Sequence, residues 1–229
     1  MKTEGGGYVV MPTKDIISNI LDALEARLGK VYFKRAYLTY DIAHAQILFP
    51  EKAEILQDLY GKSARYTPGV MIVTSDTGYA AAKIFPIWDI DSDTVIFGDI
   101  EEGIYMPHRG KSASMENLID DIPNIFLKLR DSIECARRQM GYKIKYPVQV
   151  VQNACKKFKL GKKDTRQMLE RLDLLMLQQP DIEITGYHIT QLFIEMVRDT
   201  VDENKKILLE TIAGKAFNLR YEKIDKELD

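Results

Sequence analysis

A run of positively charged side chains between Lys143 and Arg166 is the clearest chemical signal in this chain. The segment reads KIKYPVQVVQNACKKFKLGKKDTR and carries eight Lys and Arg against a single acidic residue, Asp164. Residues 109–171 hold 15 Lys and Arg and 7 Asp and Glu, whereas both flanks are acidic and the whole chain has a formal net charge of −2. Positive charge concentrated between acidic flanks directs a polyanion to one place. The pattern therefore predicts phosphate binding.

Aromatic side chains lie among these cations. Single-stranded nucleic acid is bound by cations that contact its phosphates and by rings that stack on its unpaired bases. Tyr142, Tyr146 and Phe158 are the candidate rings. The predicted phosphate contacts are Lys143, Lys145, Lys156, Lys157, Lys159, Lys162 and Lys163. In the alternative interpretation, the segment is a solvated linker between helices, and Tyr146, Val148, Val151 and Phe158 fill a hydrophobic core.

A second basic group, His108, Arg109 and Lys111, precedes a predicted helix. Backbone N–H groups at the start of a helix favour anions, and two cations beside them would hold a phosphate. We include these three residues in the predicted nucleic-acid site. The alternative is a strand-to-helix turn that carries basic residues for no binding purpose.

Three aspartates at alternate positions, Asp89, Asp91 and Asp93, resemble the first ligands of a calcium-binding loop. An EF-hand needs glycine at its sixth position, where Thr94 stands, and a bidentate glutamate at its twelfth, where Ile100 stands. We therefore expect no tightly bound calcium and interpret the aspartates as a polar turn between strands.

No motif predicts an enzyme or a cofactor. The three histidines, His44, His108 and His188, are too scattered for a metal motif, and Ser75 has no visible His and Asp partners. One enzyme class stays as a weaker alternative, a metal-dependent nucleic-acid enzyme that uses the three aspartates and Glu101. The two cysteines have no partner motif and are predicted to be reduced thiols.

Apolar spacing and turn residues predict an α+β fold in which strands come first and helices follow. We expect an N-terminal helix from Thr13 that ends at Gly29, strands within residues 31–107 and a long helix from Pro123. Further helices are predicted at residues 164–178, 185–200 and 202–217, the last opened by a capping box from Thr200 to Glu203. The predicted domains are residues 1–141, an α+β core with a hairpin-rich antiparallel sheet and a long helix, and residues 142–229, a basic linker with a helical C-terminal region.

Tyrosines within the strand-rich region offer a second place for stacking on bases. Tyr37, Tyr40 and Tyr66 would form a ring-bearing face if they pointed to the same side of the sheet. Tyrosine is also a common strand former, and we favour packing for these three residues.

Three segments share motifs with a known family: PGVMIVTSDTGYAAAKIFPIW at 68–88, MPHRGKSASMENLIDDI at 106–122 and ITGYHITQLFIEMVRDTVDENKKILLETIAGKAF at 184–217. The motifs are an S-x-x-G turn at 75–78, the His108-Arg109 pair and the Ala213-Gly214 step. In these the chain resembles the phage- and plasmid-encoded proteins of the domain-of-unknown-function 932 family. It lacks the R-x-x-C-x-N segment of that family and has IFPIWDIDSDTVIF in its place. The resemblance implies a phage or mobile-element origin and, more loosely, similarity to single-strand annealing proteins of the Rad52-like type.

These observations together predict a non-catalytic, phage-type protein that binds single-stranded DNA or another nucleic acid in a basic groove between the sheet and the helical half. Strand annealing in recombination is the expected process, with the protein acting as a homo-oligomer without cofactor or metal. No apolar run is long enough to cross a membrane, and the first residues do not resemble a signal peptide, so the host-cell cytoplasm is the expected location. The alternative is a phage-encoded interaction protein that binds and inhibits a host or defence protein.

Overall fold

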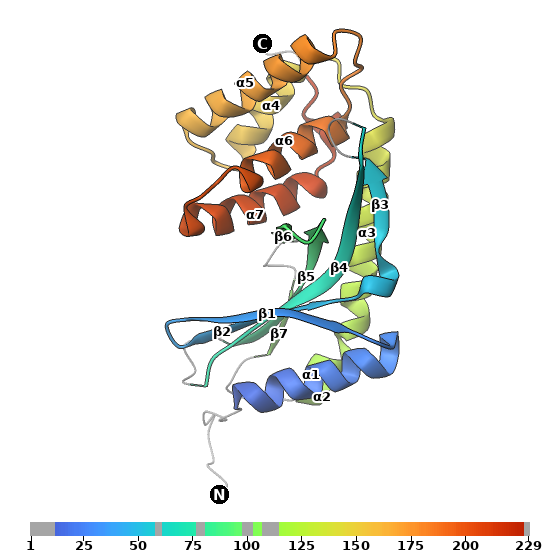
Figure 1. Ribbon diagram of the computed structural model, residues 1–229, viewed down its shortest axis with the longest axis vertical. Helices are drawn as coiled ribbons and strands as arrows, with labels where there is room; N and C mark the ends of the chain where they lie inside the picture. Colours follow the sequence, from blue (N-terminus) through green and yellow to red (C-terminus); the bar gives the residue numbers. More distant parts are fainter. Residues whose placement is uncertain (1–11, 58–60, 77–80, 98–102, 107–114, 227–229) are drawn as a thin grey trace, which may run out of the picture. The chain divides into compact units, whose positions relative to one another are not determined.

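Seven antiparallel strands precede most of the helices, which confirms the predicted α+β class (Figure 1). In this computed structural model, which describes residues 12–57, 61–76, 81–97, 103–106 and 115–226, the order of the sheet is β1-β2-β4-β5-β6. Strand β3 also pairs with β4, and β7 with β5. The strands are β1 (Tyr32–Thr39), β2 (Ile42–Leu48), β3 (Glu54–Gln57), β4 (Ser63–Thr74), β5 (Ala82–Ile90), β6 (Thr94–Phe97) and β7 (Ile104–Met106).

The helices predicted above are present, together with two that the sequence patterns did not indicate, α2 and α4. The short helical stretch that Pro50 favours is instead a single 3-10 turn, Pro50–Lys52, followed by strand β3. The helices are α1 (Thr13–Leu28), α2 (Met115–Asp120), α3 (Ile122–Gly141), α4 (Pro147–Lys157), α5 (Lys162–Gln178), α6 (Gly186–Arg198) and α7 (Glu203–Phe217). Helix α4 occupies the segment that one interpretation took as a solvated linker. Pro147 fits its first turn, where no N–H is needed, and Val150, Val151 and Ala154 are buried. Among the described helices, none combines the length and apolar character that a membrane crossing requires.

The described residues group into two compact units. The first contains the described residues up to Ile55, then Arg65–Asp91 and those between 103 and Leu129. The second contains the described residues of Leu56–Ala64, the stretch Ser92–Phe97 and those from Arg130 onward.

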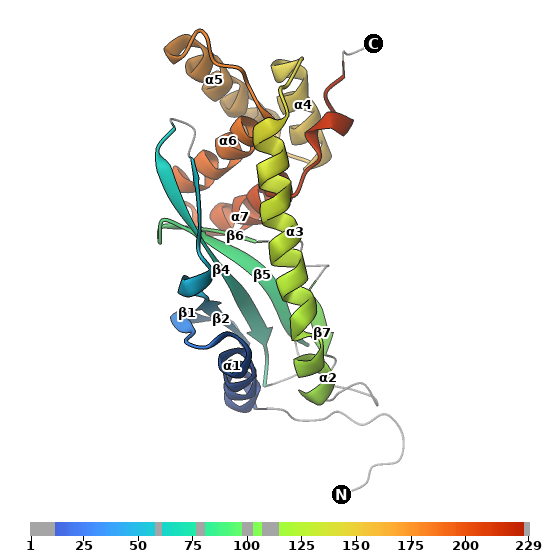
Figure 2. The ribbon, with the colours of Figure 1, turned by 90° about the vertical axis from the view of Figure 1, so that its right-hand side faces the viewer.

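The central strands form the core of the first unit, and nearly every residue of β5 and of β4 from Tyr66 onward is buried. Neighbouring strands place Ala45 beside Ile72 and Ile72 beside Ile84, and all three side chains are fully buried. Because successive residues of these strands are buried, and not only alternate ones, both faces of the sheet are covered along them. Helix α1 buries one stripe of apolar residues and contacts α2 (Figure 2). The strands are therefore held in a fixed register.

Helix α6 is the centre of the second unit. It lies between α5 and α7 and also contacts β6 (Figure 1). Every residue from Gly186 to Val197 is buried except His188 and Glu195, which are half-buried. A helix that is buried on all sides must be surrounded by other elements. The neighbours of α6 therefore depend on it for their packing.

The start of α7 corrects one prediction from the sequence. The N-cap is Asp202, whose carboxylate accepts a hydrogen bond of 2.9 Å from the Lys205 N–H. Thr200 is not the cap, because its hydroxyl donates to the Met196 carbonyl at the end of α6, at 2.7 Å. The predicted capping box fails because Thr200 finishes one helix and Asp202 starts the next.

A capping box does open α6, with a histidine in the usual place of glutamate or glutamine. The His188 N–H donates to the Thr185 hydroxyl at 3.4 Å, and the Thr185 N–H donates to Nδ1 of His188 at 3.0 Å. Burial lowers the pKa of His188. Nδ1 can accept this hydrogen bond only while the imidazole is neutral.

We expect the stability of the protein to fall on mild acidification, in part through His188. Because its folded pKa lies below the unfolded value of about 6.5, the unfolded state binds more protons between these two values, and stability is lost as the pH falls through this window. His188→Gln should keep the cap and flatten the pH dependence. Urea unfolding at pH 7.5 and pH 5.5 measures the difference. Because the pKa of His44 is also lowered, by burial and by the nearby Arg35, part of the dependence should remain. Identical pH dependence in parent and variant would contradict the assignment.

Candidate nucleic-acid interface

Helix α4 divides the predicted lysine contacts into two groups. Lys143 and Lys145 precede the helix, whereas Lys156, Lys157, Lys159, Lys162 and Lys163 follow or end it. Eleven residues of helix place the two groups about 16 Å apart. The segment is therefore not one continuous row of cations.

The first lysine group lies beside acidic residues. Lys143 forms an exposed ion pair of 2.6 Å with Glu183, and its backbone pairs with Thr185. The Lys145 N–H donates to the Asp225 carboxylate at 2.9 Å. These carboxylates offset much of the positive charge, so this group offers a polyanion little net attraction.

Asp225 caps helix α4 from the other end of the chain. Its carboxylate accepts hydrogen bonds of 2.9 Å each from the backbone N–H of Tyr146, the N-cap residue, and from the Tyr142 hydroxyl. Burial and this bond to Asp225 raise the pKa of Tyr142. Tyr142 therefore has a bonding role within the fold that the stacking interpretation did not foresee.

The second group surrounds the turn between α4 and α5, which we call the lysine turn: Lys156, Lys157, Lys159, Lys162 and Lys163. All five side chains are exposed. Within the part of the chain that the structure describes, none of the five forms an ion pair. Five uncompensated cations within eight residues give this turn a strong local positive charge.

The backbone of the lysine turn is fixed by hydrogen bonds. The Phe158 N–H donates to the Ala154 carbonyl and the Leu160 N–H to the Cys155 carbonyl, both at 2.9 Å. Lys159 takes the left-handed conformation, with φ 56°, that such a helix end requires. The Phe158 ring packs edge-on against Phe193, with 5.5 Å between ring centroids. Phe158 thus anchors the turn to α6. The core-filling interpretation fits Phe158 and the buried Val151, but Val148 is exposed.

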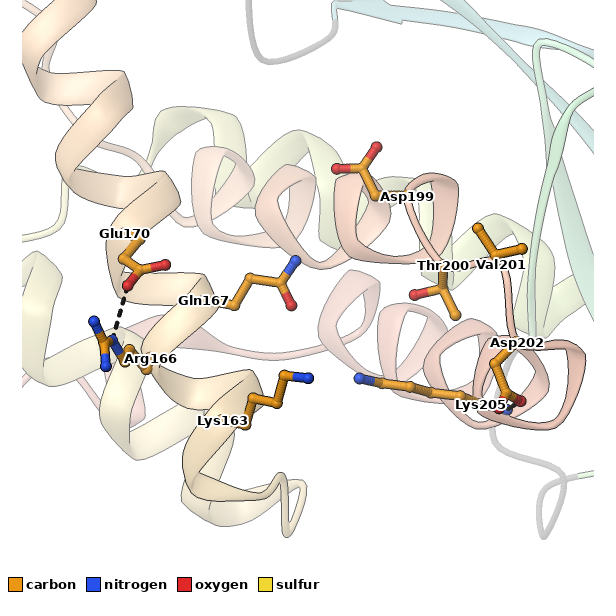
Figure 3. Close-up of a pocket in the computed structure, with 9 residues that line it drawn as sticks. All are labelled: Lys163, Arg166, Gln167, Glu170, Asp199, Thr200, Val201, Asp202 and Lys205. Atoms are coloured by element: carbon orange, nitrogen blue, oxygen red, sulfur yellow. Dashed lines mark hydrogen bonds and ion pairs between the residues drawn. The ribbon is translucent and has the colours of Figure 1, made fainter.

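A pocket of about 620 Å³ opens beside the lysine turn, between α5 and the connection from α6 to α7 (Figure 3). It is lined by Lys163, Arg166, Gln167, Glu170, Asp199, Thr200, Val201, Asp202 and Lys205. In Figure 3 the ammonium groups of Lys163 and Lys205 point toward each other. Only Lys163 and Arg166 of this set belong to the basic segment. Gln167 and Glu170 follow them in α5, and the fold brings the other residues from α7 and from the connection between α6 and α7.

The charges of the pocket are balanced, with three cations and three carboxylates in its lining. Arg166 pairs with Glu170 at 2.8 Å, and Lys205 pairs with Asp164 at 2.6 Å. The other two carboxylates are also engaged, that of Asp199 by Arg171 and that of Asp202 by its cap. Among the described cations that line the pocket, Lys163 alone lacks an ion pair. Of the described cations in this pocket, Lys163 is therefore the one that remains available to a phosphate, and it already belongs to the lysine turn.

The second basic group, His108, Arg109 and Lys111, lies outside the described residues, as does Gly78 of the S-x-x-G turn. Ser75 is fully buried. The phosphate-binding turn that we predict at His108 therefore stays a prediction.

The three aspartates point to different partners. Asp89 is buried and forms an ion pair with Lys34, and Asp91 accepts a hydrogen bond of 2.7 Å from the Arg65 N–H. Asp93 lies 3.7 Å from Arg198. Across the described ranges, no group of three or more His, Cys, Asp or Glu side chains is arranged to hold a metal ion. Asp91 and Asp93 lie in the predicted polar turn, whereas Asp89 belongs to strand β5, where its charge is compensated by Lys34. Glu101 lies outside the described residues.

Both cysteines have free thiols in the interior of the second unit. Burial raises the pKa of Cys135, and it raises the pKa of Cys155 to about 11. Thiols with raised pKa values are poor nucleophiles at neutral pH. They serve as core residues.

The three predicted tyrosines do not share one environment. Tyr66 is fully buried, whereas Tyr40 is 96% exposed at the turn between β1 and β2. The ring of Tyr37 stacks on the ring of His44 at 4.6 Å between centroids. The packing interpretation is therefore right for Tyr66, and Tyr37 belongs to a cross-strand stack that the sequence did not reveal.

Comparisons with known proteins add no relative. No family model, no curated protein and no solved structure matches the chain. The resemblance to the domain-of-unknown-function 932 family stays a prediction from short motifs.

Proposed function

We propose that this protein binds single-stranded nucleic acid without catalysis and that the lysine turn contacts the phosphates. One observation carries the proposal: five lysines are exposed around a rigid turn without an ionic partner in the described chain. Elsewhere in the described chain several cations are paired, as Lys34 is with Asp89 and Arg171 with Asp199. A polyanion would supply the missing negative charge.

A backbone-directed site of this kind holds a strand without reading its sequence. Phosphate contacts fix the position of a nucleic acid but carry no sequence information. The unpaired bases then stay available for pairing with a second strand. Annealing in phage recombination, toward which the family resemblance points, is therefore the process that we propose, with the protein acting as a homo-oligomer in the host cytoplasm.

We expect replacement of all five lysines of the lysine turn by alanine to weaken oligonucleotide binding strongly. Each phosphate contact releases counterions, so the logarithm of affinity falls with the logarithm of salt concentration by about 0.7 per contact for single strands. Loss of five contacts would reduce that slope by up to about 3.5. Fluorescence anisotropy with a labelled oligothymidylate over a salt series measures both quantities.

The matched control replaces five exposed lysines outside the lysine turn: Lys14, Lys30, Lys52, Lys223 and Lys226. This variant changes the net charge by the same amount as the lysine-turn variant. Because its lysines lie outside the lysine turn, it should retain most of the oligonucleotide affinity and of its salt dependence. Equal losses in the two variants would show that only overall charge matters. If the parent protein does not bind oligonucleotides at low salt, the proposed function is wrong. The alternative, a protein that inhibits a host or defence protein, then takes its place.

A further inference from the structure

The register of the sheet lines up five side chains from five strands. Tyr37 of β1 is opposite His44 of β2, and His44 is opposite Val73 of β4. Val73 is in turn opposite Lys83 of β5, and Lys83 is opposite Tyr105 of β7. Directly opposite residues of antiparallel strands point to the same face of the sheet. These five residues, the aromatic band, therefore cross one face from side to side.

The aromatic band is open to solvent although the sheet around it is packed. Tyr105 is 59% exposed, and Tyr37, His44, Val73 and Lys83 are half-buried. The neighbouring residues on the same face, two positions along each strand, include Gln46, Met71 and Phe85, and these are buried. The band is thus the accessible margin of a rigid surface.

Each end of the band combines a ring with a cation. The Arg35 guanidinium lies 4.6 Å from the centre of the Tyr37 ring, and the Lys83 ammonium lies 5.8 Å from that of Tyr105. Within the described ranges, neither cation has an ion-pair partner. Other cations of the strands are held by acceptors, for example Lys34 by Asp89 and Arg65 by the Pro50 carbonyl.

Rings and uncompensated cations along the accessible margin of a sheet face match the chemistry of a single-stranded nucleic acid. Bases stack on aromatic side chains, and the adjacent phosphates are attracted by cations. The band itself contains no carboxylate that would repel phosphate. We propose that the aromatic band binds unpaired bases of single-stranded nucleic acid, an inference that rests on the proposed function.

The distance between the rings of Tyr37 and Tyr105 sets the number of nucleotides that a single strand of nucleic acid needs to contact both. Four strand-to-strand steps of about 4.8 Å place Tyr37 and Tyr105 roughly 19 Å apart. At about 3.4 Å per nucleotide in a stacked strand, this distance spans five or six nucleotides, and fewer in an extended strand. Affinity should therefore rise with oligonucleotide length and level off once both rings are reached.

The test replaces rings while keeping apolar bulk. Tyr37→Leu and Tyr105→Leu should each weaken binding of an oligothymidylate by roughly 5- to 100-fold. Tyr37→Phe and Tyr105→Phe keep the ring and should bind as the parent does. The control is Tyr40→Leu, which makes the same substitution at an exposed tyrosine outside the band. Circular dichroism and thermal unfolding check that each variant is folded.

A second probe separates base binding from phosphate binding. An abasic oligonucleotide of the same length carries the same backbone charge without bases, so the two Tyr→Leu variants should bind it as the parent does. If both variants bind the oligothymidylate as tightly as the parent while the lysine-turn variant does not, the aromatic band proposal is overturned and the proposed function stands. If the parent protein binds no oligonucleotide, the proposed function and the aromatic band proposal are both wrong. A loss on the abasic strand as large as that on the oligothymidylate would also overturn base stacking.

Discussion

Replacing Gly214 by alanine is expected to cost the second unit about 4 kcal/mol or more of its stability, or to prevent it from folding. Gly214 lies in α7, where the backbone of the helix meets β6. A Cβ atom at this position would lie 1.3 Å from the Phe97 carbonyl oxygen and 2.3 Å from its carbonyl carbon. The clash is with backbone atoms, which cannot turn aside as a flexible side chain can. The helix must therefore move away from the strand.

Gly141 provides the matched control for this substitution. It ends α3, and a Cβ atom there would meet nothing within 4 Å. Gly141→Ala should leave the protein unchanged or stabilise it by up to about 1 kcal/mol, because alanine favours helix more than glycine does. Urea unfolding followed by circular dichroism compares the two variants. Unfolding of Gly214→Ala at the same urea concentration as the parent would contradict the close contact between α7 and β6.

Replacing Gln139 by methionine is the change with the second largest expected effect. Its amide nitrogen lies 3.0 Å from the Ala216 carbonyl, 3.2 Å from that of Phe217 and 2.8 Å from that of Leu219. The first two carbonyls belong to the last turn of α7, and the third lies two residues beyond its end. The Gln139 carbonyl oxygen accepts a hydrogen bond of 2.9 Å from the Thr190 hydroxyl. One buried side chain therefore joins α3, α6 and the end of α7.

Methionine has nearly the same shape as glutamine but no amide group, so Gln139→Met removes a buried donor to these carbonyls and the buried acceptor of the Thr190 hydroxyl. Each buried group without a partner costs about 1–3 kcal/mol, and we expect a total loss of about 3 kcal/mol or more. Gln178→Met, at an exposed position of α5, is the control and should change stability by less than about 0.5 kcal/mol.

A double-mutant cycle with Thr190→Val then tests whether the network acts as a unit. Thr190 also lies within hydrogen-bonding distance of the Ala216 carbonyl and of the Tyr221 hydroxyl. Groups that share partners show coupling energies of about 0.5–3 kcal/mol. Additive losses in the double variant would show that the two side chains act separately.

Local patterns were sufficient to predict the elements that bury a regular apolar stripe. Helix α1 shows this, because Ile16, Ile20 and Leu24 recur at helical spacing and Gly29 follows the last turn in a left-handed conformation. Helix α4 shows the limit of such patterns. Its apolar positions are few and its C-terminal end is rich in lysine, so the sequence pattern does not indicate a helix there. Its N-terminus is capped by Asp225, which is distant in the sequence.

The sequence by itself determined the α+β class, the order of strands and helices and the position of the basic segment. These properties follow from apolar periodicity, turn residues and charge, which act between residues close together in the chain. Tertiary structure alone decided that Lys143 faces Glu183 while the lysine turn stays unpaired. It also decided that Tyr37 and Tyr105 share one face of the sheet. Both outcomes depend on packing between residues far apart in the chain. For the two tyrosines strand register is decisive, because a shift of one residue in either strand would turn that side chain to the opposite face.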